Sequence, residues 1–266
     1  MSCIFMFCDI RQFTDATECL QEEVFVFTNK IAAVIHSICH SNGGSANKNV
    51  GDAFLLSWLL DEAPVEKGEK EDDPFKTSNH INTGNPEVLH ANSNQADKAL
   101  LSVVRISMAL YYDKYFTDGM NEEAKHRLLT KLSKRKGPIV QMGFGLHAGK
   151  AVQGAIGSQR KIDATYISES VERSEFLESS TKRYGVPLLM SDSFYNLLSP
   201  YNRYRCRQVD QLIMLTEESN GLSDPHEILD SGEKMNIVSE VICLLLTYIL
   251  SSNIYNFYSL WHVNTQ

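Results

Sequence analysis

The chain has 266 residues, of which 43% are apolar, and its 25 basic and 33 acidic side chains give a net charge of −8. A chain of this length and apolar content can bury the core of one large domain or two small ones, which excludes a disordered or fibrous protein. The acidic balance argues against nucleic acid as a partner, because binding to a phosphate backbone requires a positively charged surface.

The N-terminal part predicts a strand, a long helix and a hairpin. A short apolar run at residues 3–8 predicts a buried strand. Apolar residues then recur at three- and four-residue spacing, which predicts an amphipathic helix over residues 17–40. Residues 46–50 and 53–59 predict two strands joined by a tight Gly-Asp turn. This order of elements is half of a ferredoxin-like unit.

Two polar stretches interrupt the pattern. Residues 61–97 contain few apolar side chains and three of the seven prolines, so we expect a disordered insertion there. Helical periodicity returns at about residue 100 and continues to about residue 115. A second polar stretch, residues 118–137, ends in a basic run and is expected to be another disordered, solvated insertion.

The second half predicts more strands around one long helix. The expected strands are 139–147, 151–156, 164–167, 186–190 and 204–215, and the expected helices are 169–184 and 192–198. The predicted fold class is therefore α/β (α+β), a ferredoxin-like βαββαβ sheet with helices mainly on one face and extra strands near the C-terminus. We expect one domain over residues 1–216, followed by a C-terminal extension over residues 217–266.

The end of the extension has no charged side chain from residue 241 onward. Its continuous apolar core, VICLLLTYIL, is much shorter than the roughly 20 residues that span a bilayer. Two interpretations of this extension remain. Either the tail, or a larger parent protein, associates with a membrane, or the extension is unstructured or buried. The six cysteines contain no CxxC pair, which indicates reduced thiols and favours the cytoplasm or the cytoplasmic face of a membrane.

Two carboxylates stand at the ends of predicted elements. Asp9 ends the first strand, and Asp52 lies in the hairpin turn that we expect beside it. Two acidic groups in a partly desolvated cleft repel each other, and a divalent cation between them relieves this repulsion. Mg²⁺ suits such a pair because it accepts carboxylates together with water and substrate phosphates. The alternative is that Asp9 caps the next helix and Asp52 is an ordinary turn residue.

Three segments occur in a recognisable order. They are FCDIRQFT (7–14), GG (43–44) with KNVGDAF (48–54), and GLHAGKAVQGAIGS (145–158). Together they closely resemble the catalytic domain of class III adenylate and guanylate cyclases, over about residues 3–209. The resemblance implies conversion of ATP to cyclic AMP and pyrophosphate in a groove between two such domains.

The resemblance also implies a role for individual residues. Asp9 and Asp52, with the backbone of Ile10, would bind two Mg²⁺ ions, which Mn²⁺ can replace. The backbone from Ile10 through Phe13 to Thr14 would wrap the phosphates.

By the same resemblance, Lys48 and Thr165 would bind the purine base. A lysine donor and a threonine acceptor fit adenine, so ATP is expected rather than GTP. Lys150 falls where the family places a basic phosphate contact, although it also fits a simple strand-edge charge.

Two positions depart from the family's pattern. Glu172 and Phe176 stand where the family has an asparagine that orients the ribose and an arginine that stabilises the transferred phosphorus. Losing such a donor or cation costs about 10² to 10³ in rate. We hypothesise a heterodimer in which this chain supplies the metal ligands and a second cyclase domain supplies the missing pair. The alternative is a catalytically inactive domain that binds nucleotide, or that dimerises with and regulates an active partner.

Three other interpretations are supported by fewer residues of the sequence. His36, Cys39 and His40 share one helix face and would reach one zinc ion, but no fourth ligand is evident. Gly43-Gly44 also resembles diguanylate cyclases, but Ser45 and Ala46 follow where their acidic pair belongs. A scaffold module with a relic nucleotide groove is the remaining alternative.

Overall fold

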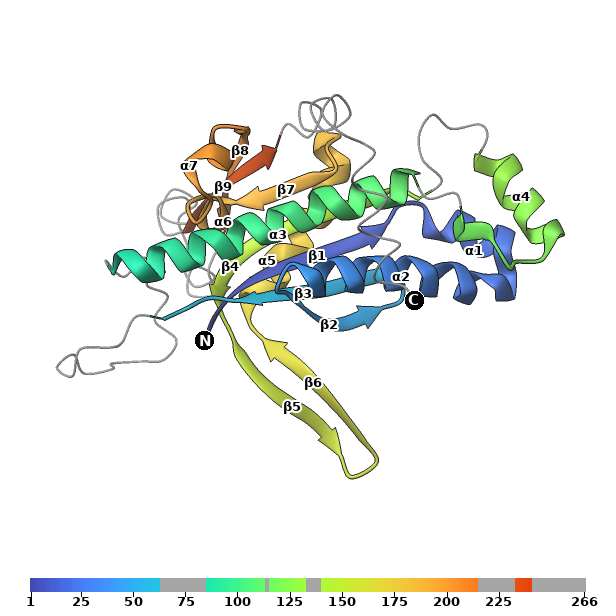
Figure 1. Ribbon diagram of the computed structural model, residues 1–266, viewed down its shortest axis with the longest axis horizontal. Coiled ribbons are helices and arrows are strands. Elements are labelled where there is room, and N and C mark those ends of the chain that lie inside the picture. Colours follow the sequence, from blue (N-terminus) through green and yellow to red (C-terminus); the bar gives the residue numbers. More distant parts are fainter. Residues whose placement is uncertain (63–84, 113–114, 133–139, 215–232, 241–266) are drawn as a thin grey trace, which may run out of the picture.

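The computed structural model describes residues 1–62, 85–112, 115–132, 140–214 and 233–240. Its main layer is a seven-stranded sheet in the order β2-β3-β1-β4-β7-β9-β8 (Figure 1). These strands are β1 (Ser2–Ile10), β2 (Ser45–Val50), β3 (Ala53–Leu59), β4 (Met142–Lys150), β7 (Leu188–Ser191), β8 (Cys206–Met214) and β9 (Glu233–Glu240). The β4–β7 pair is parallel and the other pairs are antiparallel. Strands β5 (Val152–Ser158) and β6 (Lys161–Ile167) form a separate hairpin that projects from the body.

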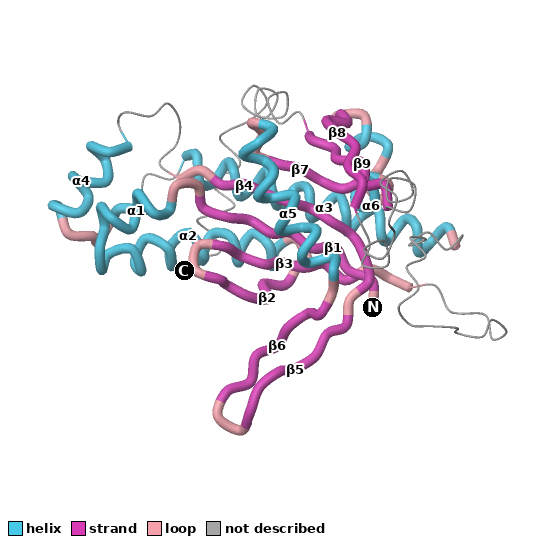
Figure 2. The backbone as a smooth tube through the Cα atoms, turned by 180° about the vertical axis from the view of Figure 1, so that it is seen from behind, coloured by secondary structure: helices cyan, strands magenta, loops and turns pink. Residues whose placement is uncertain are grey.

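Helices cover both faces of the sheet. The helices are α1 (Phe13–Leu20), α2 (Val24–Ser41), α3 (Pro86–Tyr112), α4 (Glu122–Leu132), α5 (Glu169–Tyr184), α6 (Asp192–Tyr195) and α7 (Pro200–Arg203), with 3-10 turns at Gln21–Glu23 and Tyr115–Thr117. Helices α2 and α3 lie on one face, and α5 lies on the other, as the opposite views in Figures 1 and 2 show. Helix α5 contacts β4, β1 and β7 directly.

Strand β1 is buried on both faces because it is central in the sheet. Its residues Ile4 and Met6 join the core formed with α2 and α3. The alternate residues Cys3 and Phe5 join a smaller core on the other face. All four side chains are at most 1% exposed. This continuous apolar run places the carboxyl end of β1 inside the fold, beside the hairpin turn between β2 and β3.

The ferredoxin-like βαββαβ prediction is confirmed by β1, α2, β2, β3, α3 and β4 in this order. The expectation that helices lie mainly on one face holds for α2 and α3, but α5 covers the opposite face. Glycines in β4 permit this close packing: a Cβ on Gly145 would overlap the backbone of Ser174 and Glu178 in α5.

The predicted disorder of the first insertion was wrong from residue 86 onward, where α3 begins. The buried side chains of α3 within the predicted insertion, Asn92 and Ala96, are polar or small, so a count of large apolar residues misses them. Ala96 is fully buried, and Asn92 is 1% exposed while it bonds to both the backbone N–H and the carbonyl of Asp61. Residues 63–84 lie outside the described part of the chain.

The second insertion also contains a helix, so its predicted disorder was wrong for residues 122–132. Helix α4 buries Ala124 and Leu128 and packs against α1. Residues 133–137 of this predicted insertion are not among those described.

The long N-terminal helix and the C-terminal extension also differ from expectation. A 3-10 turn at Gln21–Glu23 separates α1 from α2. The segment Phe13–Ser41 is long and apolar enough to cross a membrane, a test that buried core helices also pass. Here α2 buries its apolar residues in the core. Residues 233–240, expected in an unstructured or membrane-associating extension, form β9 inside the main sheet. The charge-free tail, residues 241–266, lies outside the described residues.

Candidate active site

Asp9 and Asp52 lie together at one end of the sheet. Asp9 is the penultimate residue of β1 and pairs in register with Ala53, the first residue of β3. Asp52 occupies the turn immediately before Ala53, and its carbonyl accepts a hydrogen bond of 3.3 Å from the N–H of Ile10. Register and turn therefore bring the two carboxylates to one place. Asp9 does not cap the following helix, because the N-cap of α1 is Gln12.

The electrostatics of Asp9 reflect this proximity. The pKa of Asp9 is raised to about 7. Desolvation is the largest cause, followed by the negative charges of Asp52 and Glu178 and a hydrogen bond with Asp52, while the charge of Lys182 acts in the opposite direction. A half-buried carboxylate beside a second one is destabilised in its charged form unless a cation is close. The Nζ of Lys182 lies 3.7 Å from Oδ2 of Asp9.

The chain turns sharply after β1 to begin α1. Gln12 adopts left-handed backbone angles (φ 56°, ψ 39°) and is the N-cap residue of α1, which begins at Phe13. The first N–H groups of any helix lack partners inside that helix, and they carry the positive end of its dipole. Residues 10–14 line the same cavity as the two carboxylates. The start of α1, at Phe13 and Thr14, therefore lines the same cavity as the carboxylate pair.

A buried ion pair supports this corner from behind. The Nη1 of Arg11 lies 2.9 Å from Oε1 of Glu178, with the side chains 15% and 5% exposed. The contact is an ion pair without good hydrogen-bond alignment, and Nη2 of Arg11 also donates to the hydroxyl of Thr181. Burial raises the pKa of Glu178, and the Arg11 charge acts in the opposite direction. Arg11 thereby links the turn after β1 to the last turns of α5.

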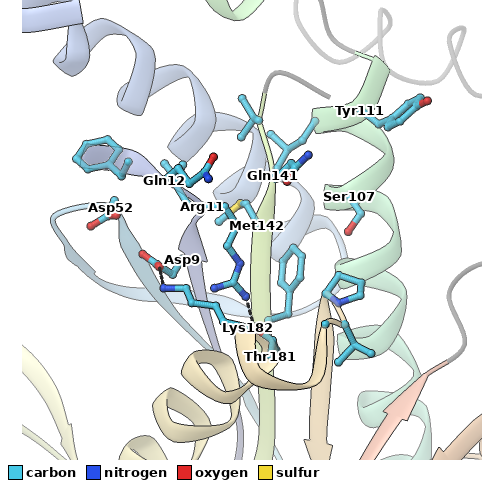
Figure 3. A pocket seen from close by; sticks show the side chains of 18 of the residues that line it. Asp9, Arg11, Gln12, Asp52, Ser107, Tyr111, Gln141, Met142, Thr181 and Lys182 are labelled. Carbon is cyan, nitrogen blue, oxygen red and sulfur yellow. Dashed lines mark hydrogen bonds and ion pairs between the residues drawn. The ribbon is translucent and has the colours of Figure 1, made fainter. Parts of the chain in front are cut away.

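The cavity has a volume of about 1020 Å³, which is at the upper end of the range for small-molecule sites. Figure 3 shows Asp9, Asp52 and Lys182 on one side of it, and Ser107 and Tyr111 of α3 on the other. The carboxylate pair, the start of α1 and Lys182 all face this cavity.

The predicted base-binding residues lie elsewhere. Lys48 is exposed in β2, and Thr165 is half-buried in β6, and neither lines the cavity. The two strands that carry them are in contact. The structure thus brings Lys48 and Thr165 to one region, outside the cavity that Asp9 and Asp52 line.

Lys150 and the two departures from the motif, Glu172 and Phe176, also lie outside the cavity. Lys150 pairs with Ser2 at the opposite end of β1 from Asp9, about 23 Å away along the strand. Glu172 and Phe176 are exposed on α5, and the side chain of Phe176 is 37% exposed. Their positions precede Lys182 by about 15 Å and 9 Å along the helix axis.

The zinc interpretation gains no support. Among the described residues, no group of three or more His, Cys, Asp or Glu side chains is placed to hold a metal ion. His36 instead lies 3.1 Å from the side-chain oxygen of Asn49, and Cys39 is fully buried. Gly44 serves packing, because a Cβ there would overlap Trp58 and Cys39.

Sequence reasoning missed Arg11, Glu178 and Lys182. One signal was present: Glu178 shares its helix face with Ser174, Leu177 and Thr181, which are all buried. A glutamate on a buried helix face requires a cationic partner. Nothing in the sequence identified that partner, because Arg11 is 167 positions away.

The sequence is similar to those of nucleotide cyclases. The sequence model described as "Adenylate and Guanylate cyclase catalytic domain" matches residues 2–221. An adenylate cyclase of Anabaena cylindrica is 26% identical over 219 residues, covering 82% of this chain and 35% of that protein. This chain therefore spans about a third of the length of that relative.

Solved structures share the fold at low sequence identity. A bacterial light-regulated adenylyl cyclase superposes with a TM-score of 0.58 at 16% identity, covering 91% of this chain and 52% of that one. The adenylyl cyclase CyaB from P. aeruginosa gives 0.54 at 18% identity, covering 90% and 93%. The guanylate cyclase domain of RhGC from Catenaria anguillulae, in complex with GTP, gives 0.54 at 17% identity, covering 90% and 96%.

Proposed function

Because the chain belongs to the adenylate and guanylate cyclase catalytic-domain family, we propose that it converts ATP to cyclic AMP and pyrophosphate as one half of a two-domain site. The observation that carries this proposal is the convergence of Asp9, Asp52 and the start of α1 on one cavity of about 1020 Å³. In this proposal Asp9, Asp52 and the carbonyl of Ile10 hold two Mg²⁺ ions.

The donor set fits Mg²⁺ or Mn²⁺. Carboxylate and carbonyl oxygens are the ligands that hard divalent cations prefer, and Mg²⁺ completes its shell with water and substrate phosphates. The raised pKa of Asp9, about 7, is the expected state of a carboxylate pair without its cation. When bound, the ions would activate the ribose 3′-hydroxyl and neutralise the triphosphate. The N–H groups at the start of α1, from Phe13 and Thr14, would bind phosphate oxygens.

A dimer explains why the predicted residues are divided between two regions. Lys48, Thr165 and Lys150 lie outside the carboxylate cavity, so in our proposal they serve a groove that is completed by a second domain. The projecting β5–β6 hairpin carries exposed apolar side chains suited to such a contact, namely Val152, Ile156, Ile162 and Ile167, each 55–69% exposed. A two-stranded hairpin is marginally stable in water unless something covers it.

The departures at Glu172 and Phe176 favour a heterodimer. Both side chains are exposed on α5 and are available to a partner, yet neither is able to orient a ribose or stabilise a phosphorane. A partner that retains the asparagine and arginine would complete the site built on Asp9 and Asp52. The second candidate is an inactive domain that binds nucleotide and regulates its partner, and the same two departures favour it.

Nucleotide choice and location are further parts of the proposal. Lys48 and Thr165 favour adenine over guanine through their donor and acceptor groups. The five described free cysteines fit a reducing compartment, which supports a place in the cytoplasm or on the cytoplasmic face of a membrane.

A restored site tests the half-site proposal most directly. The double variant Glu172→Asn/Phe176→Arg supplies the missing pair, so its homodimer should form cyclic AMP from MnATP at least tenfold faster than the unmodified chain. Asp52→Asn added to that variant should abolish turnover, whereas Glu122→Gln, at an exposed carboxylate in α4, should leave it unchanged. Cyclic AMP and cyclic GMP are quantified by chromatography with ATP or GTP as substrate.

Mixing separates the two candidate functions. The unmodified chain should regain turnover with a cyclase domain that keeps the asparagine and arginine but has lost its own metal-binding aspartates. Nucleotide binding without turnover in this mixture and in the restored variant would support the regulatory alternative. Turnover that survives Asp52→Asn would refute the proposed metal site.

A further inference from the structure

The carboxylate pair already has a cation from its own chain. The Nζ of Lys182 lies 3.7 Å from Oδ2 of Asp9, and the side chain of Lys182 faces the cavity (Figure 3). Asp9 itself is held in the sheet, with its side chain 18% exposed. The ammonium group therefore lies where a divalent cation bound by Asp9 and Asp52 would also be attracted.

Contacts at the end of α5 fix the backbone of Lys182, whereas its ammonium group is able to move. Arg11 holds the preceding residue, Thr181, and also pairs with Glu178 one turn earlier. These contacts attach the last turn of α5 to Arg11, two residues after Asp9. The side chain of Lys182 is 61% exposed, so no close packing prevents its ammonium group from moving away from Asp9.

A lysine and a divalent cation compete for the same oxygens. Asp9 and Asp52 together offer two negative charges, and an ammonium group in contact with Oδ2 both blocks that oxygen and repels a second cation. An exposed lysine pair is weak, because water screens it and the long side chain loses entropy. A divalent ion held by both carboxylates would therefore displace the lysine at a modest cost in affinity.

We propose that Lys182 is a built-in counter-ion of the metal site, which pairs with Asp9 while no divalent metal is bound and is released into the cavity when metal binds. This inference rests on the proposed metal site at Asp9 and Asp52. Lys182 is a positioning residue: it sets the affinity of the empty site for metal and stabilises the metal-free carboxylate pair.

The test measures Mn²⁺ binding to the nucleotide-free protein by electron paramagnetic resonance. Lys182→Met should bind Mn²⁺ about two- to fivefold more tightly than the unmodified chain, which is the scale of an exposed ion pair. Lys182→Arg, which keeps the charge, should bind no more tightly than the unmodified chain. Lys161→Met is the matched control, because Lys161 is also exposed and also pairs with an aspartate, Asp163, but in the projecting hairpin. Its Mn²⁺ affinity should not change.

A second readout uses thermal unfolding. The increase in melting temperature on adding saturating Mn²⁺ should be larger in Lys182→Met than in the unmodified chain, because only the metal-free form loses an ion pair. If Asp52→Asn loses the metal but Lys182→Met binds Mn²⁺ no more tightly than the unmodified chain, the proposal about Lys182 is overturned. If Asp52→Asn binds Mn²⁺ as tightly as the unmodified chain, the metal site itself is wrong, and both proposals fail.

Discussion

The buried pair of Arg11 and Glu178 offers a quantitative test of how the site is supported. Its closest atoms are 2.9 Å apart, and the two side chains are 15% and 5% exposed. At an effective dielectric constant of about 20, charges at this separation attract by about 6 kcal/mol. Desolvation opposes this gain, and burial is the leading cause of the raised pKa of Glu178, ahead of the effect of Arg11. The pair should therefore be costly to break but contribute little net stability.

The perturbation is a double-mutant cycle of Arg11→Met and Glu178→Met. Each single change leaves one charge buried without its partner and should cost about 3–5 kcal/mol of unfolding free energy. The double variant replaces the pair by apolar side chains and should cost no more than about 2 kcal/mol. For a domain of this size, the single variants should melt roughly 6–20 °C below the unmodified chain.

Urea unfolding monitored by circular dichroism gives the coupling energy, which from these values is expected to be at least about 4 kcal/mol. Arg127 and Glu123 on α4 are the matched control, since their atoms are also 2.9 Å apart but the side chains are 38% and 80% exposed. Their coupling should stay below about 0.5 kcal/mol. Additive effects at Arg11 and Glu178, within about 0.5 kcal/mol, would refute the buried pair.

Three further changes test the backbone and the carboxylates. Gly145→Ala should lower the unfolding free energy by about 1–3 kcal/mol in urea titrations, because its Cβ would overlap the backbone of α5. Gly154→Ala is the control and should have no effect, because a Cβ there meets nothing within 4 Å. Equal effects of the two variants would contradict the close packing of β4 and α5. Gln21→Gly should raise the unfolding free energy by about 1 kcal/mol. Gln21 has φ 53° and ψ −123°, backbone angles that are strained for any residue with a side chain. A loss of stability in Gln21→Gly would count against that conformation. The pKa of Asp9, about 7 in the folded chain, exceeds its unfolded value of about 3.9. The folded state therefore holds an extra proton between these values, and the metal-free unfolding free energy should fall by about 2–4 kcal/mol from pH 4 to pH 8. Asp9→Asn should remove most of that fall when urea midpoints are compared in a chelator, and an unchanged slope would exclude Asp9 as its source.

Local patterns were sufficient for much of the architecture. The apolar run of the first strand, the Gly-Asp turn and the bounds of α5, Glu169–Tyr184, agree with the sequence predictions. The pairing of Asp9 with Asp52 followed from a strand end and a hairpin turn, because register places adjacent strand ends together. Patterns failed where inward residues are not large and apolar, as at Asn92 and Ala96 in α3.

Sequence alone therefore determined which elements form and which carboxylates share one end of the sheet. Only the tertiary structure showed that α5 crosses the other face and brings Glu178 and Lys182 to Arg11 and Asp9. It also placed Lys48 and Thr165 outside the cavity that the carboxylates line. The physical reason is range: periodicity and turn chemistry act between near neighbours, whereas an ion pair between residues far apart in the sequence exists only after the sheet and helices have packed.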